Sequence, residues 1–293
     1  MHHLEPTQKS DPVRTLVRLA GLAVAAGLLV PGLAASAQEA FPEPERCPRF
    51  IAHGPPALPV MKAAYRVAQA AGSTVSISYE GHSTFLIESP AGVTIATDYN
   101  DSVRLPLVPT IATMNIAHIS HYSLAPDPAI AHVLPGWGDD APAHYDLTVR
   151  DVWLRNVTTN IRGGSFGFDG DAGVRRDMNS IFVFEVAGLC IAHLGHLHQR
   201  LTADHLDALG RIDVVLVPVD GGRTLSVGSM LDVLRDIQAP VIIPMHWFGQ
   251  STLGRFTAQL EEYYAVEYSD VSSVDLSRET LPRLPTMIVL PPG

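Results

Sequence analysis

The chain has 293 residues, of which 46% are hydrophobic and 17% are charged, a composition typical of a folded globular protein and not of a disordered or fibrous one. Its 20 Lys and Arg residues against 30 Asp and Glu residues give a formal net charge of −10, which disfavours nucleic acids and anionic lipid surfaces as partners. Its 2 cysteines exclude a four-thiolate zinc site and a disulfide-dense scaffold, so the 13 histidines are the unusual feature of this composition.

Residues 1–37 have the pattern of an export signal. Arg14 and Arg18 precede an apolar run from Leu19 to Val30, and small residues follow up to Ala37. An apolar run of about 12 residues is shorter than the roughly 20 that span a bilayer, so an uncleaved anchor is the less favoured alternative. We expect cleavage near Ala37 and a periplasmic or secreted product without stable membrane insertion.

An oxidising compartment would also bear on the two cysteines. Cys47 and Cys190 could form one disulfide there. Cys190 lies in an apolar run, so a buried free thiol is an equally open alternative.

The predicted elements of the mature chain form a single domain. A Pro-rich arm at 38–59 precedes this domain, which spans 60–293 without a second change of composition. In chain order the first half contains a helix at 61–71, strands at 74–79, 83–88, 93–97 and 114–119, a hairpin at 145–157, a Gly- and Asp-rich loop at 163–177, and a hairpin of strands 180–185 and 189–193.

The second half alternates helices and strands. Helices are predicted at 202–209, 229–237 and 253–264, and strands at 212–217 and 241–244. A run of strands followed by strand and helix alternation predicts a sheet-rich α/β domain whose outer faces are covered by helices.

Histidines gather where predicted strands end. Seven lie at strand ends or in the loops that follow them: His82, His118, His121, His193, His196, His198 and His246. Loops at strand ends bring distant segments together, and neutral imidazole is the commonest metal ligand, so three or four of these rings would bind zinc or a similar cation. A lone histidine is more often structural, which we apply to His53, His132, His144 and His205, while His193 stays open between the two roles.

Five segments together resemble a known family. Residues 78–87, 93–99, 193–198, 212–219 and 243–247 are similar, in order and spacing, to motifs of the metallo-β-lactamase-fold hydrolases, in particular the ascorbate-phosphate lactonase-like branch. This resemblance implies an α/β fold of the αββα four-layer sandwich type, with the site along one edge of the two sheets.

The ligand motif departs from that family. Its central Ser/Thr-His-x-His-x-Asp-His sequence corresponds here to residues 120–126, where only His121 matches, and the position of its metal-bridging aspartate is His196. Extra imidazoles, His118 and His198, lie beside these two positions. An imidazole cannot bridge two cations as a carboxylate does, so the resemblance favours a rebuilt site with one metal ion.

We therefore expect His121, His196 and His246 to hold one zinc ion, with His118 or His198 as a further ligand or hydrogen-bond partner; iron, manganese or nickel are the alternatives. Three neutral ligands leave an open position whose water titrates near pH 7 instead of 15.7.

Three acidic or basic side chains are candidates for supporting roles. Asp220 is a candidate for proton transfer, for ligation, or for orienting a histidine, although a turn residue before two glycines is an equal alternative. Asp98 is either a hydrogen-bond acceptor behind the site or a turn residue, and His82 is a candidate for proton transfer or substrate contact.

The sequence thus predicts an exported metal-dependent hydrolase that acts on a small ester, lactone or phosphoester through a metal-bound hydroxide. The alternative is a non-catalytic metal- or ligand-binding protein that keeps the same fold. The substrate is a small molecule in the first case, and nothing in the sequence fixes the oligomeric state.

Overall fold

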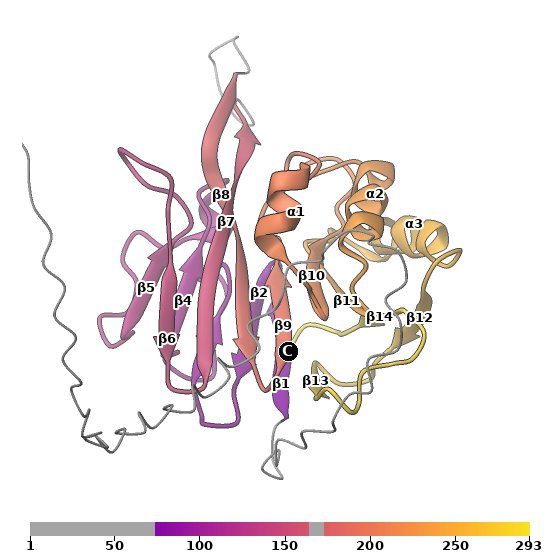
Figure 1. The fold of residues 1–293 in the computed structure, drawn as a ribbon, viewed down its shortest axis with the longest axis horizontal. Helices are drawn as coiled ribbons and strands as arrows, with labels where there is room; N and C mark the ends of the chain where they lie inside the picture. Colours follow the sequence, from indigo (N-terminus) through magenta and orange to yellow (C-terminus); the bar gives the residue numbers. More distant parts are fainter. Residues whose placement is uncertain (1–73, 164–172) are drawn as a thin grey trace, which may run out of the picture. The chain divides into compact units, whose positions relative to one another are not determined.

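A computed structural model of the chain describes residues 74–163 and 173–293 (Figure 1). The predicted export signal, the Pro-rich arm and the predicted helix at 61–71 lie outside these residues. The tip of the predicted loop at 163–177 also lies outside them.

One sheet has six strands in the order β13-β1-β2-β3-β4-β5. These strands are β1 (Val75–Gly81), β2 (Thr84–Glu88), β3 (Thr94–Ala96), β4 (Ile111–Met114), β5 (His132–Pro135) and β13 (Ser273–Leu276). The pairs from β13 to β3 are antiparallel, whereas β3, β4 and β5 are parallel. The predicted meander of three strands is therefore confirmed as β1 to β3.

The other sheet has eight strands in the order β12-β14-β11-β10-β9-β8-β7-β6. They are β6 (Asp146–Val149), β7 (Val152–Arg162), β8 (Val174–Val186), β9 (Leu189–His193), β10 (Val214–Pro218), β11 (Val241–Met245), β12 (Ala265–Tyr268) and β14 (Thr286–Val289). Strands β9, β10, β11, β14 and β12 are parallel, and β6 to β9 are antiparallel. Both predicted hairpins are confirmed.

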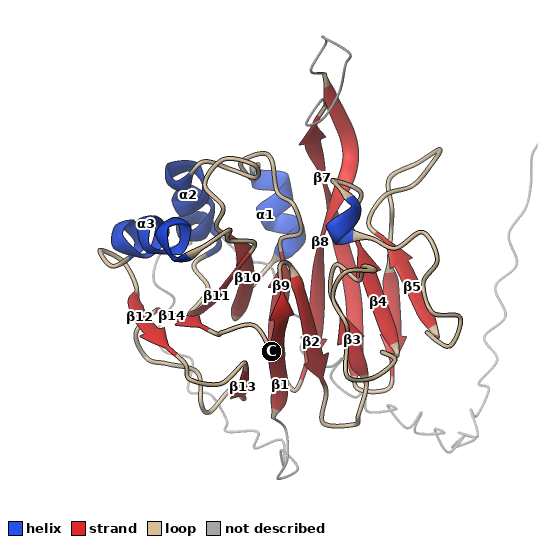
Figure 2. Cartoon of the chain, turned by 180° about the vertical axis from the view of Figure 1, so that it is seen from behind, coloured by secondary structure: helices blue, strands red, loops and turns tan. Residues whose placement is uncertain are grey.

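Three helices cover the outer face of the eight-stranded sheet (Figure 2). They are α1 (Ala203–Leu209), α2 (Val227–Ile237) and α3 (Gln250–Leu260). Alternate residues of β10 face opposite sides: Val215 and Val217 pack in the cluster that includes the helices, and Val214 and Leu216 pack in the cluster between the sheets. The domain is thus the predicted α/β sandwich of two sheets, and within the described residues α1, α2 and α3 cover one of the two outer faces on which helices are predicted. No described helix is long and apolar enough to cross a membrane.

One predicted strand is wrong. The strand expected at 114–119 ends at Met114, and the chain then turns into a short 3-10 helix, η1 (Ile119–His121). Asn115 accounts for the end, because its backbone N–H bonds to the carbonyl of His121 and its side chain bonds to Asp98 and Ser180 instead of extending a ladder.

Candidate metal centre

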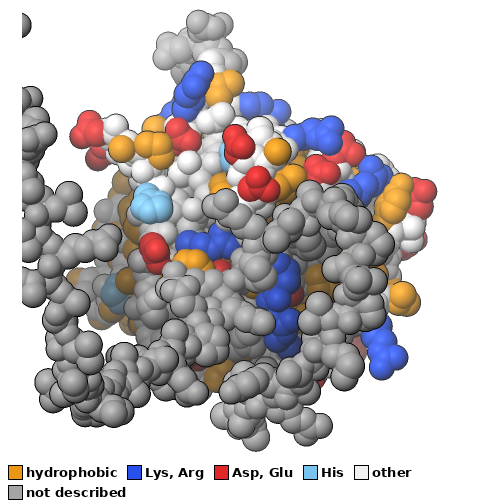
Figure 3. All heavy atoms as spheres, in the orientation of Figure 1, with side chains coloured by type: hydrophobic (Ala, Val, Ile, Leu, Met, Phe, Trp, Pro, Cys, Tyr) orange, Lys and Arg blue, Asp and Glu red, His pale blue; other side chains and the backbone are white. Residues whose placement is uncertain are grey.

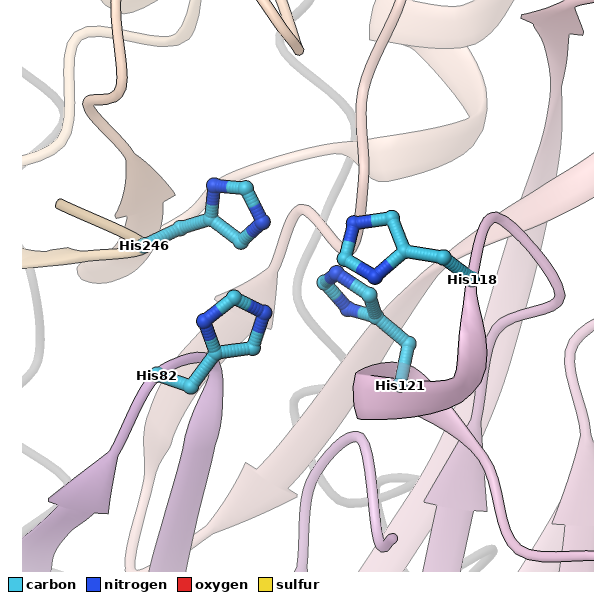
Figure 4. A group of neighbouring side chains, drawn as sticks. All are labelled: His82, His118, His121 and His246. Atoms are coloured by element: carbon cyan, nitrogen blue, oxygen red, sulfur yellow. The ribbon is translucent and has the colours of Figure 1, made fainter. Parts of the chain in front are cut away.

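Four histidines from three connecting segments of the sandwich meet at one place (Figure 4). His82 lies in the turn between β1 and β2, His118 and His121 follow β4, and His246 directly follows β11. One ring nitrogen of each lies within 4.8 Å of the others, a group that can hold a metal ion. The ends of β4 and β11, which pair in parallel with their neighbours, bring three of the rings here, and the antiparallel turn from β1 to β2 brings His82.

The rings pack against one another. Ring centroids lie 4.3 Å apart for His82 and His246, 4.3 Å for His118 and His121, and 5.1 Å for His121 and His246. In Figure 4, His82 from the β1–β2 turn and His246 after β11 face His118 and His121, which follow β4. His121 and His246 are buried, whereas His82 and His118 are half-buried and form the more open side of the group.

Two carboxylates orient the two buried rings. His121 Nδ1 donates to Asp98 Oδ2 at 2.5 Å, and His246 Nδ1 donates to Asp220 Oδ2 at 3.0 Å. The Nε2 atom of each ring is buried and has no hydrogen-bond partner. A buried imidazole lone pair without a partner, backed by a carboxylate on the other nitrogen, is the arrangement that metal-ligating histidines use. The residues therefore fit a divalent cation.

Asp98 is held in place from several sides. Its carboxylate accepts from Asn115 Nδ2 at 2.9 Å, and its carbonyl accepts from Asn100 Nδ2 and Thr84 Oγ1. Complete burial raises the pKa of Asp98 to about 6, because it disfavours the charged form more than the nearby His193 favours it. Of the two predicted roles for Asp98, the structure supports the hydrogen-bond acceptor behind the site.

Asp220 uses its oxygens within its own loop and on His246. It accepts from the backbone N–H groups of Gly222, Arg223 and Thr224 and from the Thr224 hydroxyl. Burial alone would raise the pKa of Asp220, but the hydrogen bonds from His246 and Thr224 hold it well below its usual range. The hydrogen bond to His246 Nδ1 is the contact expected of a carboxylate that orients a histidine, and the predicted proton transfer stays a prediction.

His196 and His198 lie beside the group and not in it. His196 Nε2 is 3.1 Å from His118 Nε2, and His196 Nδ1 is 2.5 Å from His198 Nε2. Of the expected ligands His121, His196 and His246, the structure brings His121 and His246 into one group with His118 and His82, and it places His196 next to His118. His82, expected as a proton-transfer or substrate-contact residue, offers a ligand atom to the group.

Burial lowers the pKa of five histidines in or beside the group. It lowers the pKa of His82 to about 3 and that of His118 and His198 to about 4, and it holds the pKa of His121 and His196 well below the ordinary value. Neutral rings keep a lone pair for a cation.

His193 has a structural role. It lies at the end of β9, and its Nε2 donates to the carbonyl of Ser83 at 2.9 Å. Both residues of this contact are buried, so His193 ties β9 to the β1–β2 turn that presents His82.

Three residues of the site have an uncommon backbone conformation. His82, Asp98 and His246 have φ angles of +53°, +43° and +58°. Such angles are sparsely populated for residues with a Cβ and persist where surrounding bonds fix them. The bond from His246 N to the carbonyl of His82, at 2.7 Å, fixes two of these three residues against each other.

Gly195 gives a test of how tightly the surroundings are packed. It has a φ of +60°, and an added Cβ would lie 2.5 Å from Asn115 Nδ2 and in closer contact with Asn179 Oδ1. These amides hold Asp98 and the backbone of His196. We expect Gly195→Ala to lower the free energy of unfolding by about 1–3 kcal/mol, measured by urea denaturation.

The control for this substitution is Gly228→Ala in α2, where an added Cβ meets nothing within 4 Å. It should leave the stability unchanged or slightly higher, because alanine is the better helix former. Equal stability of the two variants would contradict the tight packing at Gly195.

The chain belongs to the β-lactamase superfamily, since the sequence profile of the Beta-lactamase superfamily domain matches residues 76–246. The fold and the histidine group define it as a metallo-β-lactamase-type protein. The predicted superfamily is therefore confirmed, and the narrower lactonase-like branch stays a prediction.

Two related proteins are each described as a UPF0173 metal-dependent hydrolase. The one from Methanoculleus marisnigri is 24% identical over 196 residues, which covers 64% of this chain and 86% of the relative. The one from Salinibacter ruber is 25% identical over 195 residues, which covers 59% of this chain and 84% of the relative.

Solved structures show the same fold. A protein of Thermotoga maritima, described as a Zn-dependent hydrolase of the metallo-β-lactamase superfamily, is 25% identical, with a TM-score of 0.52 over 73% of this chain and 98% of that one. A metal-dependent hydrolase structure from Parabacteroides distasonis, at 15% identity, has a TM-score of 0.50 over 64% of this chain and 89% of that one.

Proposed function

We propose that the protein is an exported metal-dependent hydrolase that acts on a small ester, lactone or phosphoester, with one metal ion held at the group of His82, His118, His121 and His246 by three of these rings and with one position open. The observation that carries this proposal is the pair of buried, partnerless Nε2 atoms on His121 and His246, each backed by a carboxylate. The relatives described as metal-dependent hydrolases support the same class of reaction.

A divalent cation at this place supplies Lewis acidity and lowers the pKa of water from 15.7 to about 7. The chain's own residues fix where that chemistry occurs. Asp98 and Asp220 keep the two buried rings in one tautomer and one orientation, and imidazole ligands, which bind as neutral groups, would leave the charge of the cation undiminished. The half-buried side, formed by His82 and His118, is where a substrate can approach.

The donor set supports a single ion. Among the residues that the structure describes, these four histidines are the one group of three or more His, Cys, Asp or Glu side chains with ligand spacing. Zinc suits imidazole ligands, and iron, manganese and nickel are the alternatives for the metallation experiment.

Export is supported by the state of Cys190, which is disulfide-bonded. Disulfides persist mainly in oxidising compartments such as the periplasm. On the face visible in Figure 3, basic and acidic side chains are interspersed over the described atoms. This mixture supports a small-molecule substrate over a nucleic acid, which would favour a basic stripe.

A non-catalytic metal-binding protein is the second candidate. Zinc held tetrahedrally by four protein ligands has no open position, which is typical of structural sites. The four-histidine group favours this alternative if all four rings stay bound.

The test is metal removal and replacement on the purified full chain. After chelation, the protein should lose hydrolysis of a panel of carboxylic esters, lactones, phosphomonoesters and phosphodiesters, and one equivalent of Zn²⁺, Fe²⁺, Mn²⁺ or Ni²⁺ should restore it. Binding of one equivalent without turnover on any of these substrates would favour the second candidate. Failure to bind any of the four ions would rule out both.

A further inference from the structure

A continuous chain of hydrogen bonds runs from β7 to the β1–β2 turn. It joins Arg162 N to His198 Nδ1 (2.7 Å), His198 Nε2 to His196 Nδ1 (2.5 Å), His196 Nε2 to His118 Nε2 (3.1 Å), His118 Nδ1 to Ser120 Oγ (2.7 Å) and Ser120 Oγ to His82 Nε2 (2.8 Å). The first of these contacts involves a backbone N–H, which can only donate. The other contacts link groups that can each donate once and accept.

The backbone donor sets the direction of the whole chain. A neutral imidazole has one N–H and one lone pair, so His198 must accept at Nδ1 and donate from Nε2. His196 then accepts at Nδ1 and donates from Nε2 to His118. Burial, together with the positive charge of Arg162, lowers the pKa of His198 to about 4, which keeps this ring neutral.

The starting point of the chain is itself anchored. The guanidinium of Arg162 donates to the carbonyls of Gly222 and Arg223, at 3.0 and 2.8 Å, and to that of Thr224. In the same loop, Asp220 accepts hydrogen bonds from three backbone N–H groups and from His246 Nδ1. One loop therefore fixes the orientation of His246 and the position of the Arg162 amide.

The direction of the chain separates two kinds of histidine. Followed to its end, it places lone pairs on the Nε2 atoms of His118 and His82, and the carboxylates place lone pairs on the Nε2 atoms of His121 and His246. These are the four members of the candidate metal group. His196 differs from them, because its Nε2 carries a hydrogen.

We propose that His196 is a hydrogen-bond donor of the active site and not a metal ligand, and that His198 is the positioning residue that sets its tautomer. This inference rests on the proposed function. When a cation occupies the lone pair of His118, the N–H of His196 loses its acceptor and is left to bond an oxygen of the substrate. Such a fixed donor stabilises the negative charge that develops on a carbonyl or phosphoryl oxygen during hydrolysis.

Two substitutions of His198 separate direction from mere packing. In His198→Gln, the amide can accept from Arg162 N–H through its oxygen and donate to His196 through its nitrogen, so the direction is kept. In His198→Glu, the carboxylate only accepts, so His196 must donate from Nδ1 and present a lone pair at Nε2. The two side chains have the same length and differ in this one property.

The measurement is 15N NMR of histidine-labelled protein, first without metal and then with 113Cd²⁺. We expect His196 to be the Nε2–H tautomer in the wild type and in His198→Gln, and the Nδ1–H tautomer in His198→Glu. With 113Cd²⁺, coupling should appear at the Nε2 atoms of His118, His121 and His246 and be absent from His196 in the wild type. In His198→Glu, coupling should appear at His196, and the affinity for Cd²⁺ should rise by about 10-fold or more, as a carboxylate-oriented ligand is gained.

A wild-type His196 that carries its hydrogen on Nδ1, or that couples to 113Cd, would overturn this inference. The wild type and His198→Gln suffice for this decision if His198→Glu does not fold. The spectra do not depend on turnover, so a correct tautomer in a protein without hydrolytic activity would count against the proposed function and leave the assignment of His196 as a donor standing.

Discussion

Replacing His246 by alanine is expected to lower the affinity for Zn²⁺ by more than about 100-fold and to abolish metal-dependent hydrolysis. Loss of a residue that only orients a ligand costs about 10- to 100-fold in metal affinity, and loss of the ligand itself should cost more. The Nε2 atom of His246 is buried and has no partner within the described part of the chain. Its ring is held by Asp220 and lies within contact of the rings of His82 and His121.

Asp220→Asn is the graded comparison. The asparagine keeps an acceptor for His246 Nδ1 but removes the negative charge, so its expected loss of Zn²⁺ affinity is about 10-fold, within the range for orienting residues. His144→Ala, an exposed histidine away from the group, should leave the affinity unchanged. Titration calorimetry with Zn²⁺ and thermal unfolding of the metal-free variants measure binding and folding separately. Equal affinity of His246→Ala and the wild type would remove His246 from the ligand set.

The sequence was sufficient for most strands because their signals are local. Runs of β-branched residues between Gly and Pro mark β1, β2, β9, β10 and β11, and these strands carry the loops with histidines. Strand β5 was missed, since its four residues lie in a Pro- and Gly-rich stretch and gain their order from parallel pairing with β4. Because β5 pairs with a strand about twenty residues earlier in the chain, its own sequence carries no local pattern that predicts a strand.

The site was predicted as a set of residues and not as an arrangement. Strand-end position identified His118, His121 and His246, but it could not rank them against His196, because the order depends on which ring nitrogens face each other. Ser120 and Arg162 were not singled out at all. A serine beside a histidine and an arginine at a strand end have no distinguishing pattern, and their roles appear only when β7, β9 and η1 are placed together.

The metal-free protein is expected to lose stability as the pH falls from about 6.5 towards 4. Burial lowers the folded-state pKa of His82 to about 3 and those of His118 and His198 to about 4, whereas an unfolded histidine titrates near 6.5. The unfolded chain therefore binds more protons below pH 6.5, so the stability is fully present above that pH and declines below it.

Asp98 works in the opposite direction, because its folded-state pKa is raised to about 6 and its contribution is lost as the pH rises through that value. The effect of this one carboxyl is smaller than that of the several imidazoles, so the free energy of unfolding should still fall as the pH falls.

Each extra proton bound by the unfolded chain changes the free energy of unfolding by about 1.4 kcal/mol per pH unit. The variant His198→Gln removes one imidazole and should therefore reduce the slope of this free energy against pH by up to that amount. Urea denaturation of the chelated protein between pH 7.5 and 4 measures the slope, and saturating Zn²⁺ should steepen it because the cation competes with protons for the same lone pairs. A flat profile in the metal-free protein would mean that the rings are already charged or exposed in the folded state, which would contradict a buried cluster of neutral ligands.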